Sequence, residues 1–548
     1  MPAPNFALAQ ASPSAITLTT PDWIVLGCYG ALLVLTGIYF SRRGAKGVRD
    51  YFLAERSMPA WAVAFSILAT AQSAATFIGV PERSYVGDLT YLAASLGPLI
   101  AALLVSAFFL PRYYRAGVAS PYELLENRFG PGARTATSWA YLLGRLLGSG
   151  ARTYIGALPL SLAVYGDATL PHVLVSIGAI MLVGTVYTLA GGVRSVIWTD
   201  VLQVCVYLGA GVAALAFLLS IVPAPLDAVL DALRTAGPDG ADKLRVVDPG
   251  IRFAPEVTIA RGAPYSILAS ITGLMLLNLA VMAIDQDLVQ RCLTCRDHLH
   301  AARSVIISQL LGVPVVLLFL AIGLLLFVYY QRPDLMGVSA PAASAPASKD
   351  IFQTFILSRM PPGLRGLMIA GVLAIGPIGI NATLNSMAST LMNDTVLRVR
   401  GSSGPASDLR ASRLLVVACG VTLAGVACLC AWWQQHSKLP LLDFAQAVLA
   451  FAYTGLLGVF LCALFTRRGS TRSAITAMLA AAGLCVLVQP FVLANLRRFV
   501  SSLPSPFAYA DAALAWAGAW AFSWHFVAGT AVAFAICLAG STPPGRRR

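Results

Sequence analysis

The segment "AFSILATAQSAATFIGVPERSY" (residues 64–85) is apolar enough to enter a membrane, yet its middle is small and polar. Gln72 and Ser73 lie at its centre, and Gly79 and Pro81 follow. Small residues let neighbouring helices approach closely. They also let a span break, so that free carbonyls and N–H groups face a cavity at the midplane. The segment therefore predicts either tight helix packing or a discontinuous span.

A second apolar stretch, "GVLAIGPIGINATLNSMAST" (residues 371–390), carries a similar interruption. Pro377 lies between Gly376 and Gly379, and Asn381 and Thr383 follow. Proline inside a helix removes one backbone hydrogen bond and clashes with the preceding turn. The sequence therefore predicts a break in this span as well.

The composition places both segments in an all-α polytopic membrane protein. Of 548 residues, 58% are hydrophobic and 11% are charged, whereas soluble domains carry about 25% charged residues. The mean hydropathy is +0.76. We expect about 13 transmembrane helices embedded in a lipid bilayer, near residues 22–40, 57–80, 91–111, 135–164, 170–190, 195–222, 265–288, 302–329, 366–396, 411–432, 441–465, 472–493 and 513–539.

The basic residues fall mainly in alternate loops, such as 41–56, 112–134 and 397–413. Lysine and arginine are retained on the cytoplasmic side of a membrane. The pattern predicts an external tail at 1–21, a transmembrane domain at 22–540 and a cytoplasmic basic tail at 541–548, in a bacterial-type inner (plasma) membrane. The net charge of +14 is thus attributed to topology rather than to nucleic acid, and no nucleic-acid partner is expected.

Two kinds of chemistry are disfavoured. The sequence has no P-loop, no GxGxxG after a strand, no HExxH and no GxSxG, so we do not expect an enzyme. The stretch "RCLTCRDHLH" holds Cys292, Cys295, His298 and His300 at a spacing that could ligate zinc. It lies where a helix begins, and a reduced turn without metal is the expected alternative.

Ionisable residues inside spans are costly and mark function. Asp200 lies about four residues into its apolar run; it either pairs with a loop arginine such as Arg194 or lies on a cation path. Arg145 and Arg152 are seven residues apart, which places them on one helix face about 10 Å apart. A buried guanidinium needs an acceptor, either an internal carboxylate or an anionic substrate.

The seventh span adds a further group of polar residues. Asn278 lies within it, and Asp285, Asp287 and Arg291 gather at its inner end. We expect the three charged residues to form a structural or gating cluster.

Several blocks in this order resemble the sodium:solute symporter family, which carries glucose, proline, pantothenate, iodide and sialic acid. They are "DYFLAERSMPAWAVAFSILAT" (50–70), "SPYELLENRFG" (120–130), "YTLAGGVRSVIWTDVLQV" (187–204) and "DQDLVQRCLTCRD" (285–297). The resemblance, which runs over about 22–540, implies the LeuT-type fold of two inverted five-helix repeats, here about 57–222 and 265–465. The first helix of each repeat is then broken, with solute and ions at the breaks.

The resemblance also implies a sodium site. Its carbonyl positions match Ala69 and Gln72, and its positions in the ninth span match Ile375, Ile378 and Gly379. Ile378 and Gly379 stand where sodium-coupled members usually carry hydroxyl residues, and a hard cation prefers oxygen ligands.

Three mechanisms stay open for a secondary transporter of this family. Sodium could bind through carbonyls and shifted side chains such as Thr383. A proton on Asp200, at a position that resembles the family's aspartate, could replace sodium. A fixed cation such as Arg145 could take the electrostatic role of sodium. The protein would then be a facilitator or an exchanger.

The positions that match the family's solute contacts are polar, apart from one at a gate. They are Gln72, Ser73, Thr76, Asn278, Met282 and Gln446. The two aromatic gate positions read Val281 and Met282, so a sugar-stacking platform is not expected. With Arg145 and Arg152 in the membrane, the sequence favours a small carboxylate-bearing solute.

The alternative class is a membrane sensor that binds the solute without carrying it. Some relatives of the family form the membrane part of signalling proteins. The sequence shows no cytosolic output domain after its last span, so a sensor would need a separate partner.

Overall fold

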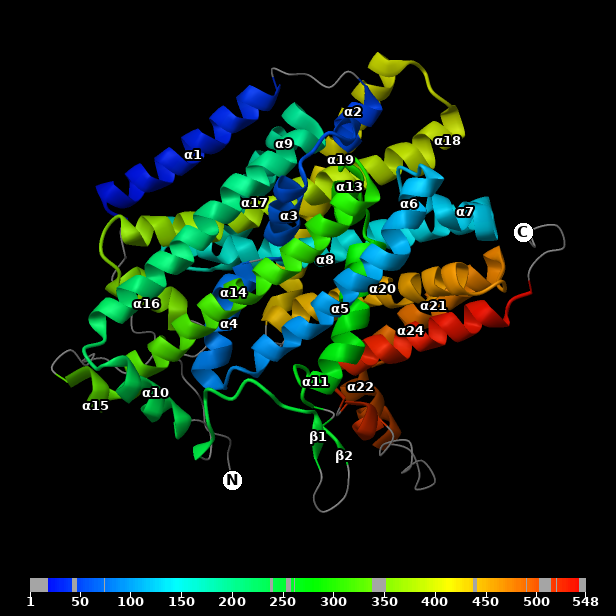
Figure 1. Cartoon of the computed structure of the whole chain (residues 1–548). Helices are drawn as coiled ribbons and strands as arrows, with labels where there is room; N and C mark the ends of the chain where they lie inside the picture. The colour runs from blue at the N-terminus through cyan, green and yellow to red at the C-terminus, as the bar shows by residue number, and fades with distance from the viewer. Residues whose placement is uncertain are drawn as a thin grey trace.

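The computed structural model describes residues 18–541 except 42–46, 73, 237–239, 253–257, 261, 338–350, 437–440, 489, 502–513 and 519. This part of the chain is a bundle of helices (Figure 1). The main ones are α1 (Thr20–Ser41), α3 (Ala60–Ala71), α4 (Ala74–Val86), α5 (Leu96–Leu104), α6 (Leu110–Ala116), α8 (Pro131–Tyr165), α9 (Leu170–Ile221), α12 (Met275–Ala283), α13 (Gln286–Leu293), α14 (His298–Gln331), α17 (Leu364–Leu391), α19 (Pro405–His436), α20 (Leu441–Phe465), α21 (Thr471–Leu487) and α24 (Phe522–Ala539).

These helices fall on the predicted spans. By length and apolarity alone, six of the described helices could cross a membrane, or eight if each bent pair is one span. The number 13 therefore stays a prediction. Apart from the helices, the described residues form one two-stranded sheet, β1 (Ile251–Arg252) paired antiparallel with β2 (Thr258–Ile259).

Two spans of the described chain are broken, and each is the first span of a predicted repeat. The chain bends by 60° between α3 and α4, and by 56° between the helical stretch that ends at Ala283 and α13. Of the two readings of residues 64–85, the discontinuous span is thus confirmed, and so is the break that the family resemblance implies for the seventh span. Gln72 is the extended residue that ends α3.

The predicted break at residues 376–379 is wrong. α17 runs as one α-helix of 28 residues from Leu364 to Leu391. It packs along α9, α8 and α19, and burial of this kind outweighs the low helix propensity of glycine and proline.

The fifth and sixth predicted spans are joined without a loop. α9 is continuous for 52 residues except at Gly192, where φ is 58° and ψ is −163°. A β-carbon there would lie 2.5 Å from the carbonyl oxygen of Tyr51, so this reversal needs glycine in both conformation and space.

The connecting segments gather at two opposite ends of the bundle (Figure 1). One end, here called the basic end, carries α2 (Val48–Leu53), α6, α7 (Glu123–Phe129) and α18 (Leu397–Arg400). The opposite end carries α10 (Leu226–Arg234), α15 (Pro333–Met336) and the small sheet. This division agrees with the predicted alternation of basic loops.

Lys243 fastens the segment after α10 to the bundle. It is 1% exposed, and its ammonium donates to the carbonyls of Tyr85 (3.0 Å) and Gly87 (2.7 Å) at the end of α4. The ring of Phe327 lies 4.3 Å from the nitrogen. Burial lowers the pKa of Lys243 to about 8.

Helix α1 is fixed to the start of α17 by one carboxylate. Asp22 is fully buried and accepts from the backbone N–H groups of Gly363 (2.9 Å) and Gly366 (2.8 Å). It also pairs with Arg365 at 2.6 Å. Asp22 therefore supplies acceptors for N–H groups that the first turn of α17 leaves free.

Candidate functional site

The charged residues predicted separately lie in one buried network near the two breaks. Arg145 of α8 donates to Asp285 at 2.8 Å, to the second carboxylate Asp287, and through Nε to the hydroxyl of Thr383 at 3.0 Å. The hydroxyl of Tyr453 donates to the same oxygen of Asp285 at 2.6 Å. Of the two acceptors predicted for Arg145, the structure provides internal carboxylates.

Asp287 extends this network to a second arginine. Its other oxygen accepts from Nε of Arg291 at 3.0 Å, and Arg291 in turn pairs with Asp200 of α9. Asp200 also accepts from the hydroxyl of Ser66 in α3 at 2.6 Å. Arg194, the alternative partner predicted for Asp200, lies instead 3.5 Å from Asp50.

The network of Arg145, Asp200, Asp285, Asp287 and Arg291 is buried, and its charges are unequal. Each of the five side chains is at most 5% exposed. Three carboxylates against two guanidiniums leave one excess negative charge when all are ionised. Among the described residues, Oδ1 of Asp200 has no hydrogen-bond partner. An uncompensated buried charge is costly, and the guanidinium of Arg152, which interacts electrostatically with Asp285 and Asp287, offsets part of this excess.

The predicted sodium positions are only partly described. Gly379 lies in α17 and is partly exposed, while the side chains of Ile375 and Ile378 lie outside the described residues. Ala69 is buried in the last turn of α3. Thr383, proposed as a substitute ligand, already accepts from Arg145 and shares a hydrogen bond of 3.0 Å with Ser149.

The predicted solute contacts that the structure describes lie at the end of α3, in α4 and in α12, and their role stays a prediction. Gln72 is buried, and its carbonyl Oε1 accepts from Tyr207 at 3.4 Å. Thr76 is half-buried in α4. Asn278 donates to the carbonyl of Leu274 in its own helix at 2.8 Å. Met282 is buried in α12, and Ser73 and the side chain of Gln446 lie outside the described residues.

Arg152 differs from Arg145 in its surroundings. It is half-buried in α8, two turns further along the helix face that carries Arg145. Within the described part of the chain, its guanidinium has no hydrogen bond or ion pair, whereas Arg145 and Arg291 each have several. Of the two arginines of α8, Arg152 is therefore the one whose donors have no partner among the described residues.

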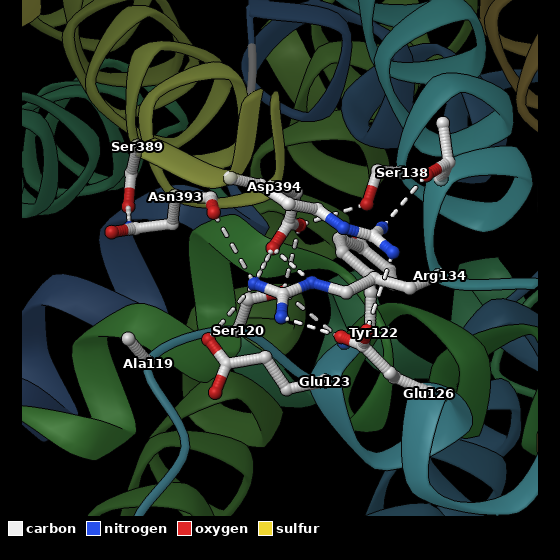
Figure 2. Close-up of polar contacts among 12 residues, drawn as sticks. Ala119, Ser120, Tyr122, Glu123, Glu126, Arg134, Ser138, Ser389, Asn393 and Asp394 are labelled. Atoms are coloured by element: carbon white, nitrogen blue, oxygen red, sulfur yellow. Dashed lines mark hydrogen bonds and ion pairs between the residues drawn. The ribbon is translucent and has the colours of Figure 1, made fainter. Parts of the chain in front are cut away.

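A second polar cluster, at the basic end, was not predicted (Figure 2). Asp394 follows α17 and is fully buried. It accepts from Ser138 at 2.8 Å, from Ser120 at 3.0 Å and from Nε of Arg134 at 2.8 Å. The sequence did carry a signal for this cluster, because Asp394 is an acid inside the predicted span 366–396. The argument applied to Asp200, that ionisable residues inside spans are costly, could have found it.

Arg134 connects this cluster to α7. Its guanidinium lies between Asp394 and the carboxylates of Glu126 (2.9 Å) and Glu123 (3.4 Å), as Figure 2 shows. Burial raises the pKa of Glu123 above its usual value, while the charge of Arg134 opposes that rise. The cluster fixes α7 to α8 and to the end of α17.

The cysteine and histidine residues at 292–300 do not form a metal site among the described residues. No group of three or more candidate ligands converges there or elsewhere in the described chain. Cys292 and Cys295 are buried thiols. His300 contacts the carboxylate of Asp297 at 2.9 Å, at the start of α14.

Comparison with known proteins gives a consistent result. The model of the family "Sodium:solute symporter family" matches residues 51–481. The chain is 28% identical over 462 residues to the sodium/sialic acid symporter of Proteus mirabilis, covering 84% of this chain and 87% of that protein. It is 28% identical over 407 residues to the human sodium/iodide cotransporter, covering 73% and 58%.

The fold agrees with a solved structure of a Na⁺-coupled sialic acid symporter in a substrate-bound outward-open state. The TM-score is 0.75 at 24% identity, with 95% of this chain and 97% of that one covered. The LeuT-type fold predicted from the sequence is thereby confirmed. The chain belongs to the sodium:solute symporter family, and it is a secondary transporter of the membrane rather than an enzyme.

Proposed function

We propose that this protein carries a small carboxylate-bearing solute together with Na⁺ by alternating access, and that Arg152 receives the carboxylate. The observation that carries the proposal is the difference between the two arginines of α8. Arg145 is occupied by Asp285 and Asp287, while Arg152 has no such partner in the part of the chain that the structure describes. Arginine binds carboxylates through a planar pair of N–H donors.

Some of the relatives support an anion, whereas others are named for glucose, which is neutral. Two of the former are named for sialic acid and for iodide, both of which are anions at neutral pH. Buried Gln72 at the first break and half-buried Asn278 in α12 supply amide groups that could orient polar parts of the same solute.

Sodium is proposed as the coupling ion because the relatives are sodium-coupled. In this chain it would rest mainly on backbone carbonyls near Ala69 and Gln72 and on α17 near Gly379. The N-terminus is proposed to lie outside and the C-terminus in the cytoplasm, so that the basic end faces inward.

The test is solute flux in proteoliposomes, with sialic acid and lactate as anionic probes and glucose as a neutral probe. We expect saturable uptake of an acid that needs a sodium gradient and is lost in Arg152→Gln. Arg152→Lys should keep part of it, because the charge remains while the planar pair is lost. Uptake of the acid by Arg152→Gln at the wild-type rate would refute the role of Arg152.

Proton coupling is the second candidate, because Oδ1 of Asp200 is buried without a partner among the described residues. It predicts uptake driven by a pH gradient in choline chloride and abolished in Asp200→Asn. Binding of the acid without flux under either gradient would favour the sensor instead.

A further inference from the structure

Helix α13 is a short buried segment that follows the second break. Every residue from Gln286 to Leu293 is buried. Because the span breaks just before it, the last carbonyls of α12 have no partner further along the same helix. At the end of α13, the carbonyl of Cys292 accepts from the backbone N–H of Cys295 at 3.1 Å and can accept one further hydrogen bond. Such groups need other donors when they are buried.

Three tyrosine hydroxyls supply these donors, and all three come from residues 113–122. Tyr113 donates to the carbonyl of Ala283, and Tyr122 donates to that of Ile284 at 3.0 Å. At the other end of α13, Tyr114 donates to the carbonyls of Cys292 (2.8 Å) and Cys295 (2.9 Å). The hydroxyls therefore hold the chain on both sides of α13.

The surroundings show that this contact is buried. Tyr113 and Tyr122 are fully buried, and the side chain of Gln286 donates to the carbonyl of Ala119 in the same segment at 3.1 Å. Gln290 donates to the carbonyl of Phe52 at 2.7 Å. α13 is thus enclosed between residues 113–122 and the segment that precedes α3.

We propose that Tyr113, Tyr114 and Tyr122 form a tyrosine latch that keeps the path to the basic end closed and sets how often it opens. Opening toward that end requires movement of the half-helix α13, since it carries Asp287 and Arg291 into the charge network. That movement must break the hydrogen bonds of the latch. This proposal rests on the alternating-access part of the proposed function and is independent of the solute and of the coupling ion.

Replacing a latch tyrosine by phenylalanine keeps the ring and removes only the donor. One buried hydrogen bond shifts a two-state equilibrium by about five- to tenfold. Tyr113→Phe and Tyr122→Phe should each raise the population of the open state by about that factor.

The chain carries its own reporter of this opening. Cys292 lies in α13 and is 1% exposed, so a water-soluble maleimide should reach it only when α13 moves. We would measure the labelling rate of Cys292 in the purified full-length protein in detergent, without solute, in a background that retains no other cysteine. Tyr113→Phe and Tyr122→Phe should each accelerate labelling about five- to tenfold.

Two controls separate opening from general loosening. Tyr51→Phe removes a hydroxyl that donates to the carbonyl of Thr188 in α9 at 3.1 Å and not to a carbonyl of α13; it should leave the rate unchanged. A second background that retains only Cys430, which is 2% exposed in α19, reports unfolding, and its rate should not change in the latch variants.

The proposal is overturned if folded Tyr113→Phe and Tyr122→Phe label at the wild-type rate, or if Cys430 accelerates equally. Should both variants fail to fold, Tyr114→Phe provides the test, because its ring is only half-buried; an unchanged rate there would again overturn the latch. Solute flux is not used in this experiment. A protein that shows the labelling difference but carries neither sialic acid nor lactate would contradict the proposed substrate alone.

Discussion

Replacing Arg145 by glutamine should destabilise the protein before any solute is present. The guanidinium holds Asp285 and Asp287 and one hydroxyl in a site where no side chain of the network is more than 5% exposed. With Arg145 removed, the excess charge of the network changes from one negative charge to two. Breaking a buried pair in this way costs about 3–5 kcal/mol, a factor of roughly 10²–10⁴ in the ratio of folded to unfolded protein.

The assay is unfolding of the purified protein in mixed micelles of increasing SDS content, without solute. Arg152→Gln is the matched control, since it removes an arginine from the same helix face; it should change stability by less than about 1 kcal/mol. Asp287→Asn in the Arg145→Gln background restores the original charge difference, and we expect it to recover about 0.5–3 kcal/mol as coupling energy. If Arg145→Gln unfolds like the wild type and only loses solute binding, Arg145 is a solute contact and the reasoning fails.

Three further predictions concern contacts outside the network. Asp22→Ala should cost about 3–5 kcal/mol in the same unfolding assay, because Arg365 and two N–H groups lose a buried acceptor; an unchanged midpoint would contradict the anchoring of α1. Asp394→Asn should cost about 1.5–3 kcal/mol of unfolding free energy. Glu123→Gln should cost less than about 1 kcal/mol, because the side chain of Glu123 is 24% exposed. Equal losses would contradict the central place of Asp394 in the cluster of Figure 2. The pKa of Lys243 in the folded state, about 8, is below the ordinary value of 10.5. As pH rises, the folded state therefore loses this proton before the unfolded state does. The stability of the wild type relative to Lys243→Met should then rise from about pH 8 to pH 10. A difference that stays flat or falls over that range would refute the lowered pKa.

The sequence was informative where a residue conflicted with its surroundings. Small polar residues at 69–76 indicated a break, and the bend between α3 and α4 confirms it. Ionisable groups in apolar runs, such as Arg145 and Asp200, indicated a site, and both lie in the buried network. The same reasoning failed at Pro377, because packing against α8 and α9 decided the helix there.

It was harder to predict which residues pair with one another than which residues belong to a site. Arg291 and Asp200 are 91 residues apart, and Arg134 and Asp394 are 260 apart, so no local pattern relates them. Arg194 seemed suited to Asp200 by proximity in sequence, yet the reversal at Gly192 places it beside Asp50. The tyrosine latch left no signal either, because a tyrosine at 113 or 122 suits a membrane boundary equally well.

The buried charge network also bears on how the protein responds to heat. The cost of removing charged groups from water falls as temperature rises, while helices that pack in lipid gain no hydrophobic stabilisation from contact with one another. The centre of the bundle, where five charged groups meet, should therefore lose little of its relative stability on warming. Helices held mainly by apolar packing, such as α21 and α24, should loosen first, so mild heating should give a partly melted carrier whose solute site is still assembled.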